Sequence, residues 1–328
     1  MAVIRYAGRS FSVMEGESAL EALLAADDEI PNHCRSGVCQ SCVMQLVAGK
    51  IDPRAQKGLK DSWQAQGLFL ACQCYPDQDL EIRLPAADRM RVGCLVTGHD
   101  KLSGGIVRLR LRPQSLFDYH PGQYVTLWRD SALGRNYSLA SVPLLDGDEL
   151  EFHIKRFSNG RLSSWLCDCV NIGDRIELQG PGGYCFYTGG DAGQDLLLAG
   201  TGTGLAPLYG ILRDALQRGH TGQIHLYHGA VNADGLYLHE ALQGLVATHQ
   251  NLHYHPCALT KSPGRCNDIR VEDLDQLLRC ERSGLQGWKV YLCGPDEFVK
   301  KQRRHCFLAG AGLKDIYADA FIDYSQSS

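Results

Sequence analysis

The feature that most constrains this chain is a group of closely spaced cysteines near its N-terminus. Cys34, Cys39 and Cys42 have the spacing C-x4-C-x2-C, and Cys72 and Cys74 follow in a separate segment. This spacing is typical of a plant-type [2Fe–2S] centre, in which four thiolates converge on a compact inorganic core. Zinc ligands usually come as two short pairs, so zinc fits the spacing less well. The sequence therefore predicts an iron–sulfur site, and its fourth ligand is either Cys72 or Cys74.

The length and the changing pattern of apolar residues indicate three domains. A chain of 328 residues is too long for one ordinary core. Residues 1–88 contain these cysteines, short strands and one helix, and residues 85–91 have no periodic apolar pattern, as expected of a linker. Residues 92–189 are mostly short strands between turns, which predicts a small antiparallel β-barrel. Residues 190–328 alternate between strands and helices, which predicts an α/β domain with a doubly wound parallel sheet.

Local signals place individual elements within these domains. Ser18 and Glu21 have the spacing of a capping box, which predicts the start of a helix that Pro31 ends. A β-hairpin is expected before this helix, around the turn at Gly8. The other expected strands include Val43–Val47, Leu80–Leu84, Ile106–Leu111, Tyr124–Trp128, Leu150–Ile154, Asp195–Leu198, Ile224–Tyr227 and Val290–Leu292, and helices are expected at Leu162–Cys169 and before Gly219.

The composition argues against several classes of protein. With 33 basic and 37 acidic residues the net charge is −4. The chain therefore lacks the excess of basic residues that is typical of a nucleic-acid binder. Residues 1–88 carry this whole excess of negative charge. Arg5 and Arg9 interrupt the region where a secretory signal would be apolar, and the uncharged stretch Leu196–Leu212 is too rich in glycine for a membrane-spanning helix. Together with fourteen cysteines, this predicts a cytoplasmic protein without a membrane or nucleic-acid partner.

The β-rich middle of the chain contains a candidate flavin site. A flavin needs a cation for its pyrophosphate, an aromatic face for its ring and a hydroxyl near the ring nitrogen that changes protonation. The run Arg135–Ser138 supplies all three, and a glycine turn at Gly160 opens a helix whose free N–H groups could hold the same pyrophosphate. Two of the candidate residues, His153 and Lys155, could equally well lie on a solvent-exposed strand face. The residues expected to bind the flavin are Arg135, Asn136, Tyr137, Ser138, His153, Lys155, Gly160, Leu162 and Ser163.

A glycine-rich turn after an apolar strand predicts a dinucleotide site. Glycines there let the backbone approach a pyrophosphate, and the start of the following helix favours its negative charge. The lysine that ends a P-loop is missing, so nucleotide hydrolysis is not expected. Ligands of such sheets bind beyond the carboxyl ends of the strands, so Cys293 should lie near a nicotinamide held at this turn. The residues expected at this site are Gly200, Thr201, Gly202, Thr203, Gly204, Cys293, Gly294 and Pro295.

Taken together, these motifs resemble the ferredoxin–NADP+ reductase-like superfamily over essentially the whole chain. The resemblance is greatest to the branch with an N-terminal plant-type ferredoxin domain, which includes the reductases of aromatic-ring dioxygenases and multicomponent monooxygenases. Leu70–Cys72 is similar to the family's fourth-ligand segment, which implies Cys72 rather than Cys74. Further similar segments are Pro121–Tyr124, Arg135–Ser138, Gly180–Gly183 and Tyr317–Phe321, the last of which brings an aromatic residue near the isoalloxazine.

This resemblance implies both a fold and a function. The fold would be a β-grasp ferredoxin domain, a six-stranded FAD-binding barrel and an NAD(H)-binding sheet. Hydride would pass from NADH to FAD beside Ser138, Cys293 and Phe321, and single electrons would then leave through a [2Fe–2S] cluster. The acceptor would be an oxygenase component or a separate ferredoxin, for which a monomer suffices. The acidic excess of residues 1–88 would favour docking to a basic patch on that acceptor.

One position departs from the family pattern, and two rival functions stay open. Many relatives have an arginine two residues beyond the equivalent of Gly229, where this chain has Val231, and Ala230–Asp234 offers no cation for a 2′-phosphate. We therefore expect a preference for NADH over NADPH.

The rival functions are a stand-alone reductase of a small molecule (a flavin, a ferric chelate or a sugar-nucleotide intermediate) and a non-catalytic redox sensor.

Overall fold

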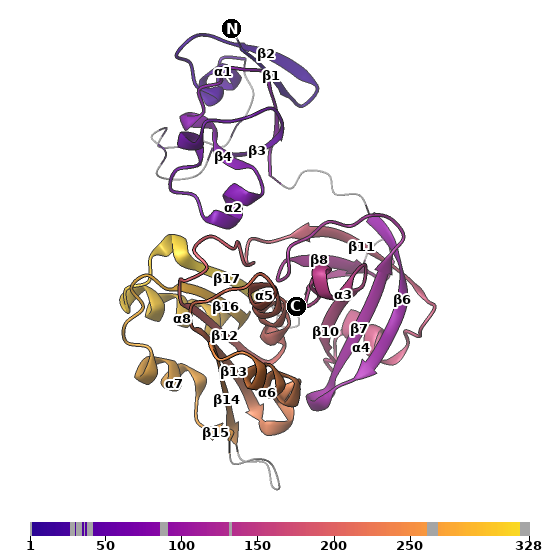
Figure 1. The fold of residues 1–328 in the computed structure, drawn as a ribbon. Helices are drawn as coiled ribbons and strands as arrows, with labels where there is room; N and C mark the ends of the chain where they lie inside the picture. The colour runs from indigo at the N-terminus through magenta and orange to yellow at the C-terminus, as the bar shows by residue number, and fades with distance from the viewer. Residues whose placement is uncertain are drawn as a thin grey trace. The chain divides into compact units, whose positions relative to one another are not determined.

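The computed structural model describes residues 2–26, 30, 35, 37, 42–85, 91–130, 133–260 and 268–321. The chain divides into two compact units, Met1–Arg89 and Met90–Ser328, which are described separately (Figure 1). Among the described residues, no helix is long and apolar enough to cross a membrane. The expected linker falls largely on residues 86–90, which lie outside the described ranges, as does Pro31, and the first strand of the second unit already begins at Arg91.

The first unit is a mixed five-stranded sheet with one longer helix, in the order β2-β1-β5-β3-β4. Strand β1 pairs with β2 in antiparallel and with β5 in parallel orientation, which gives the β-grasp arrangement expected for this part of the chain. The core lies between this sheet and helix α1, where Leu20 and Leu23 are buried with Ile4 and Phe69. The elements are β1 (Ala2–Tyr6), β2 (Arg9–Val13), α1 (Ala19–Leu24), β3 (Val43–Ala48), η1 (Pro53–Gln56), α2 (Asp61–Ala65), β4 (Leu68–Leu70), η2 (Ala71–Gln73) and β5 (Leu80–Arg83).

The predicted capping box at the start of α1 is confirmed. The Ser18 hydroxyl accepts the Glu21 N–H at 3.3 Å, and the Glu21 carboxylate accepts the Ser18 N–H at 2.8 Å. These contacts, first with the Ser18 backbone and then with its hydroxyl, hold the pKa of Glu21 below its ordinary value. Both partners therefore satisfy N–H groups that the first helical turn leaves unpaired.

The first half of the second unit is a six-stranded antiparallel sheet in the order β10-β7-β6-β11-β8-β9. In β7 buried and partly exposed positions alternate, and Leu109 and Leu111 are among the buried ones. The Ala140 N–H donates to the Glu151 carbonyl at 2.9 Å, so the two edge strands β9 and β10 are tied together and the sheet curls toward a barrel. The elements are β6 (Arg91–Lys101), η3 (Ser103–Gly105), β7 (Ile106–Pro113), β8 (Tyr124–Trp128), β9 (Gly134–Ser138), α3 (Pro143–Asp146), β10 (Leu150–Lys155), α4 (Arg161–Asp168) and β11 (Arg175–Gly182).

The second half of this unit is an all-parallel sheet in the order β15-β14-β13-β12-β16-β17, with helices on both faces (Figure 1). Helices α5 and α6 contribute to the core on one face, and α7 and α8 to the core on the other. The strand order reverses between β12 and β16, so the predicted doubly wound sheet is confirmed. The elements are β12 (Leu196–Thr201), η4 (Gly202–Gly204), α5 (Leu205–Gln217), β13 (Ile224–Asn232), η5 (Ala233–Gly235), α6 (His239–Thr248), β14 (Leu252–Thr260), β15 (Arg270–Val271), α7 (Leu274–Glu281), β16 (Lys289–Pro295), α8 (Asp296–Leu308), η6 (Leu313–Asp315) and β17 (Ile316–Phe321).

The capping box gives the first testable prediction. Ser18→Ala removes the cap of α1 and should lower the opening free energy of this helix by about 1 kcal/mol. Amide hydrogen exchange of residues 19–24 should then be about fivefold faster than in the unchanged chain. The exposed Ser12 of β2 provides the control, and equal exchange in Ser12→Ala and Ser18→Ala would contradict a stabilising cap.

Candidate cofactor and nucleotide sites

Two of the four predicted iron ligands lie in the described part of the chain, and the fold brings their segments together. Cys42 directly precedes β3 and Cys72 lies in η2 directly after β4, and these strands pair with Val43 opposite Leu70. The Ala71 N–H donates to the Cys42 carbonyl at 3.0 Å, which fixes the two segments side by side. Both cysteines are buried. Cys34 and Cys39 lie outside the described residues.

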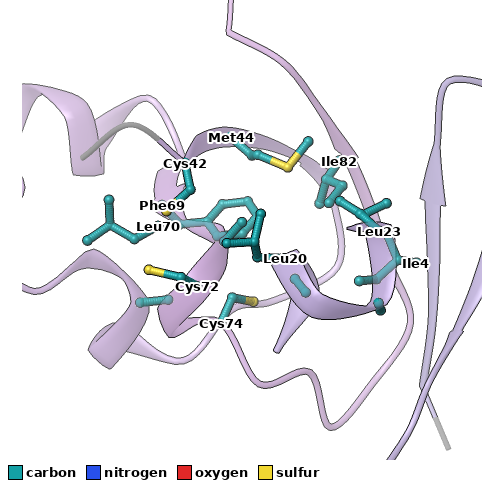
Figure 2. Close-up of a cluster of buried hydrophobic side chains, with 14 of the residues drawn as sticks. Ile4, Leu20, Leu23, Cys42, Met44, Phe69, Leu70, Cys72, Cys74 and Ile82 are labelled. Atoms are coloured by element: carbon teal, nitrogen blue, oxygen red, sulfur yellow. The ribbon is translucent and has the colours of Figure 1, made fainter. Parts of the chain in front are cut away.

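The side chain of Cys74 points away from this pair. Figure 2 shows the sulfurs of Cys72 and Cys74 directed to opposite sides of their segment. The Cys74 carbonyl accepts the Ala19 N–H at 2.7 Å, so this residue anchors helix α1 within the core. Burial raises the pKa of the Cys74 thiol to about 12. The arrangement fits Cys74 as a buried apolar residue and Cys72 as the fourth ligand.

The described residue Gly37 lies close to Gln73, the residue that follows Cys72. Gly37 has φ +82°, and a Cβ there would lie only 3.0 Å from Cγ of Gln73. The same Gln73 donates its Nε2 hydrogen to the Cys72 sulfur at 3.6 Å. Burial raises the pKa of the Cys42 thiol to about 11, so iron would bind here by displacing the proton. Soft thiol donors with a nearby N–H donor fit an iron–sulfur cluster.

The predicted flavin residues of β9 line an edge of the barrel. Arg135 and Asn136 are exposed, Tyr137 is half-buried and Ser138 is buried. Helix α4 begins after Gly160, and no described side chain caps its first N–H groups. A Cβ at Gly160 would lie 2.2 Å from the Ser163 hydroxyl oxygen, so a larger residue there would require this hydroxyl to move. A cation, an aromatic ring and free helix N–H groups on one barrel fit an FAD pyrophosphate and ring.

His153 and Lys155 share one face of β10, as alternate residues of a strand do, but the interpretation of a solvent-exposed face fails for His153. Lys155 is exposed, whereas the His153 side chain has no exposed surface. The two His153 ring nitrogens lie 2.9 Å from a Glu151 carboxylate oxygen and 3.1 Å from the Tyr237 hydroxyl. These partners arise because β10 packs against the segment around η5, so His153 joins the barrel to the parallel sheet. Its ring nitrogens are therefore already used within the protein.

The three glycines of the nucleotide turn are suited to their positions for different physical reasons. A Cβ at Gly204 would lie 2.2 Å from the Cys293 carbonyl oxygen, and one at Gly200 would lie 2.8 Å from the same atom. These two glycines therefore permit close packing of the turn against β16. Gly202 has φ +55°, and a Cβ there would meet no described atom within 4 Å. Gly202 is thus the glycine whose backbone lies open, as a pyrophosphate-binding turn requires.

The nucleotide turn lies where the strand order of the sheet reverses. Gly200 of β12 is in register with Cys293 of β16, so both residues lie at the carboxyl ends of adjacent strands. Such a reversal leaves a crevice beyond the strand ends, because the following helices go to opposite faces. Cys293 is fully buried, and burial raises its pKa well above the ordinary value, so the group is a neutral thiol.

The sequence analysis missed a functional candidate on β17. The Ser138 hydroxyl donates to a carboxylate oxygen of Asp319 at 3.0 Å, although 181 residues separate them. Asp319 is also in register with Cys293, so β17 places its carboxyl group between the barrel edge and the nucleotide crevice. Burial raises the pKa of Asp319 to about 6. Phe321 ends the described part of β17 opposite Pro295 and is half-buried. Asp319 stands in the quoted segment Tyr317–Phe321, but only the fold connects it to Ser138.

Comparison with known proteins agrees with this geometry. The chain matches an iron–sulfur (2Fe-2S) cluster binding domain over residues 4–77, an oxidoreductase FAD-binding domain over residues 94–187 and an oxidoreductase NAD-binding domain over residues 198–304. The ferredoxin–NAD(P)+ reductase component of a naphthalene 1,2-dioxygenase system from Pseudomonas putida is 33% identical over 93% of this chain and 94% of that protein. The chain belongs to the ferredoxin–NADP+ reductase-like superfamily.

Further relatives also match this chain over nearly the whole length of both proteins. The reductase subunit of an aromatic O-demethylase from Amycolatopsis is 34% identical over 89% of this chain and 90% of that protein. The crystal structure of an Amycolatopsis cytochrome P450 reductase superimposes with a TM-score of 0.67 at 28% identity, covering 98% of this chain and 99% of the other. The predicted fold class, the [2Fe–2S], FAD and NAD cofactors and the electron-transfer oxidoreductase activity are confirmed, and a purely non-catalytic sensor is excluded.

The glycine turn gives the second prediction. Gly204→Ala should abolish nucleotide-dependent activity and destabilise the parallel sheet, because its Cβ would overlap the Cys293 carbonyl. Gly202→Ala should fold with a loss of only about 1–2 kcal/mol, since the cost is that of a left-handed backbone. Its KM for the nucleotide should rise instead. Thermal unfolding and steady-state kinetics separate these effects, and equal stability of both variants would contradict the assigned packing.

Asp319 gives a third prediction, for the dependence of stability on pH. Its pKa is raised from 3.8 to about 6, so the folded chain holds this proton more tightly than the unfolded chain. The resulting stabilisation is complete below the ordinary pKa and is lost as the pH rises through about 6. Asp319→Asn should therefore raise Tm more at about pH 7.5 than at about pH 5. The exposed Asp118 provides the control, and a Tm change independent of pH would contradict the shift.

Proposed function

We propose that this chain is an NADH-dependent reductase component that supplies electrons to an oxygenase component, directly or through a separate ferredoxin. The observation that carries the proposal is the contact between Ser138 and Asp319, because it joins the flavin barrel to the strand beside Cys293. Bound FAD would accept two electrons as hydride and release them singly, and a [2Fe–2S] cluster accepts one electron at a time. The relatives named above serve dioxygenase and demethylase systems, which supports an oxygenase as acceptor.

The residues would divide the work as follows. The backbone around Gly202 and the first turn of α5 bind the nucleotide pyrophosphate. Arg135 and the N–H groups of α4 hold the flavin pyrophosphate, and Tyr137 covers the ring. Ser138, Cys293 and Phe321 line the place of hydride transfer, where Ser138 and Asp319 together hold a proton beside the reacting ring. The four cluster ligands are Cys34, Cys39, Cys42 and Cys72. The three domains of the proposal are residues 1–88, which hold the cluster, residues 92–189, which bind FAD, and residues 190–328, which bind the nucleotide.

The identity of the electron acceptor distinguishes the proposed reductase component from a stand-alone reductase. A stand-alone reductase would reduce a free flavin, a ferric chelate or a sugar-nucleotide intermediate without any protein partner. The acidic residues 1–88 favour a basic protein surface, with association that weakens as salt rises. NADH oxidation should therefore accelerate when a candidate oxygenase is added, and the gain should fall at high salt. Equal rates with and without that oxygenase would favour the rival.

Two further features of the proposal concern the state of the protein in the cell. Every cysteine within the described residues is a free thiol, which supports a cytoplasmic location. A monomer suffices for a carrier of single electrons. Sedimentation of the holoprotein and fractionation of the source cells test these two statements.

The fourth prediction concerns the choice of nucleotide. Val231 is 66% exposed at the end of β13, and the neighbouring Asn232 side chain accepts the Gly235 N–H at 3.1 Å. An apolar exposed side chain offers a 2′-phosphate no partner, so kcat/KM should favour NADH by about tenfold or more. Val231→Arg should raise kcat/KM for NADPH by about tenfold, whereas the uncharged Val231→Gln should not. A tenfold preference of the unchanged chain for NADPH would refute the proposal.

The fifth prediction separates the two candidate fourth ligands. Cys72→Ala should lose most of the bound iron and sulfide, while Cys74→Ala should keep them, because only the Cys72 sulfur lies on the side of Cys42 (Figure 2). NADH-driven reduction of ferricyanide should survive in both variants, since it needs only the flavin unit. Iron analysis and electron paramagnetic resonance measure the cluster. A cluster lost in Cys74→Ala and kept in Cys72→Ala would reverse the assignment.

A further inference from the structure

A second thiol lies against Cys293 and has no place in the function proposed so far. The Cys185 and Cys293 sulfurs are 3.8 Å apart, a distance at which one thiol can donate a hydrogen bond to the other. The two residues are 108 positions apart in the chain, and both are buried. Cys185 follows β11, so the flavin barrel and the nucleotide sheet each contribute one of the two sulfurs.

The segment that carries Cys185 is firmly held. A Cβ at Gly122 would lie 2.6 Å from the Cys185 carbonyl, so the chain packs closely against the turn before β8. The next residue, Phe186, stacks on His120 with ring centroids 4.2 Å apart and an interplanar angle of 12°. Tyr187 in turn hydrogen-bonds to His220 at 3.0 Å. Cys185 is therefore held by its own backbone and by the two residues that follow it, and it can act as a rigid contact for Cys293.

The other side of Cys293 is fixed by the last strand. Asp319 lies opposite Cys293 in the β16–β17 pair, so the last strand runs directly beside this residue. Both thiols belong to one buried core that also contains Leu205 and Leu208. Cys293 thus lies between Asp319 on the neighbouring strand and the Cys185 sulfur.

We infer that Cys185 is a positioning residue that holds the Cys293 thiol in the rotamer used for hydride transfer. The inference rests on the proposed function, because it needs a nicotinamide at the crevice beside Cys293. Without the Cys185 sulfur, the Cys293 side chain can rotate into the space that Cys185 leaves. The floor of the crevice would then change shape beneath the nicotinamide, while the pyrophosphate-binding turn at Gly202 stays as it is.

The test compares two variants of Cys185 with two matched controls in the full-length holoprotein. Cys185→Ala removes the contact, and Cys185→Ser keeps a hydrogen-bond donor at the same place. Cys94 is a buried cysteine of β6 whose sulfur donates to the Val92 carbonyl at 3.8 Å, so Cys94→Ala and Cys94→Ser measure the effect of changing a buried thiol elsewhere. The measured quantities are the rate of flavin reduction by NADH in single-turnover mixing, the KM for NADH, and the S–H stretching bands in the infrared.

We expect the reduction rate to fall about tenfold in Cys185→Ala with an unchanged KM, since a small misplacement in the reacting geometry slows the step but not the binding. Cys185→Ser should recover most of the rate. An S–H band that disappears in Cys293→Ala should shift in both Cys185 variants and in neither Cys94 variant. A rate in Cys185→Ala equal to that in Cys94→Ala, or an unshifted band, would overturn the inference.

These outcomes are distinct from failure of the proposed function. If NADH does not reduce the flavin of the unchanged protein, the proposed function itself is wrong. If the unchanged protein is active and the Cys185 variants match the Cys94 variants, only the role of Cys185 is wrong. Should Cys185→Ala fail to fold, the infrared bands of the unchanged protein and of Cys185→Ser still decide the question.

Discussion

The second unit depends on one close approach between backbones. The turn after β12 packs directly on the Cys293 carbonyl of β16, which is possible only because Gly200 and Gly204 have no side chain. This contact brings the carboxyl ends of two adjacent parallel strands together at the reversal of strand order. It leaves Gly202 open toward the crevice. The position of the candidate nucleotide site therefore follows from packing within the sheet rather than from a separate binding loop.

Burial determines the chemical state of the groups around this crevice. Ser138 comes from the barrel, Cys293 from β16 and Asp319 from β17, so three distant segments supply one small polar cluster. Burial raises the pKa of both Cys293 and Asp319, so the thiol stays neutral and the carboxyl group titrates near neutral pH. A neutral thiol and a carboxyl group that exchanges its proton readily suit a site where a ring nitrogen gains and loses charge.

The sequence predicted those parts of the site that depend on neighbouring residues. The cysteine spacing, the Ser18 cap and the glycine turn are local patterns, and each indicated the correct fold. Asp319 was missed because its partner is 181 residues away, and Cys185 because its partner is 108 residues away. A solvent-exposed face stayed open as an interpretation of His153 because strand alternation alone cannot show that Tyr237 covers this side chain. Long-range contacts of this kind arise from how β10, β11 and β17 pack, which the sequence pattern does not specify.

The central claim is that one chain carries electrons from a pyridine nucleotide through a flavin to an iron–sulfur cluster. An anaerobic titration of the holoprotein with NADH tests it most directly, with the flavin followed by visible absorbance and the cluster by electron paramagnetic resonance. The account predicts that the flavin absorbance falls and the cluster signal appears without any added partner. A preparation that contains flavin, iron and sulfide but shows no change in either signal on addition of NADH would contradict it.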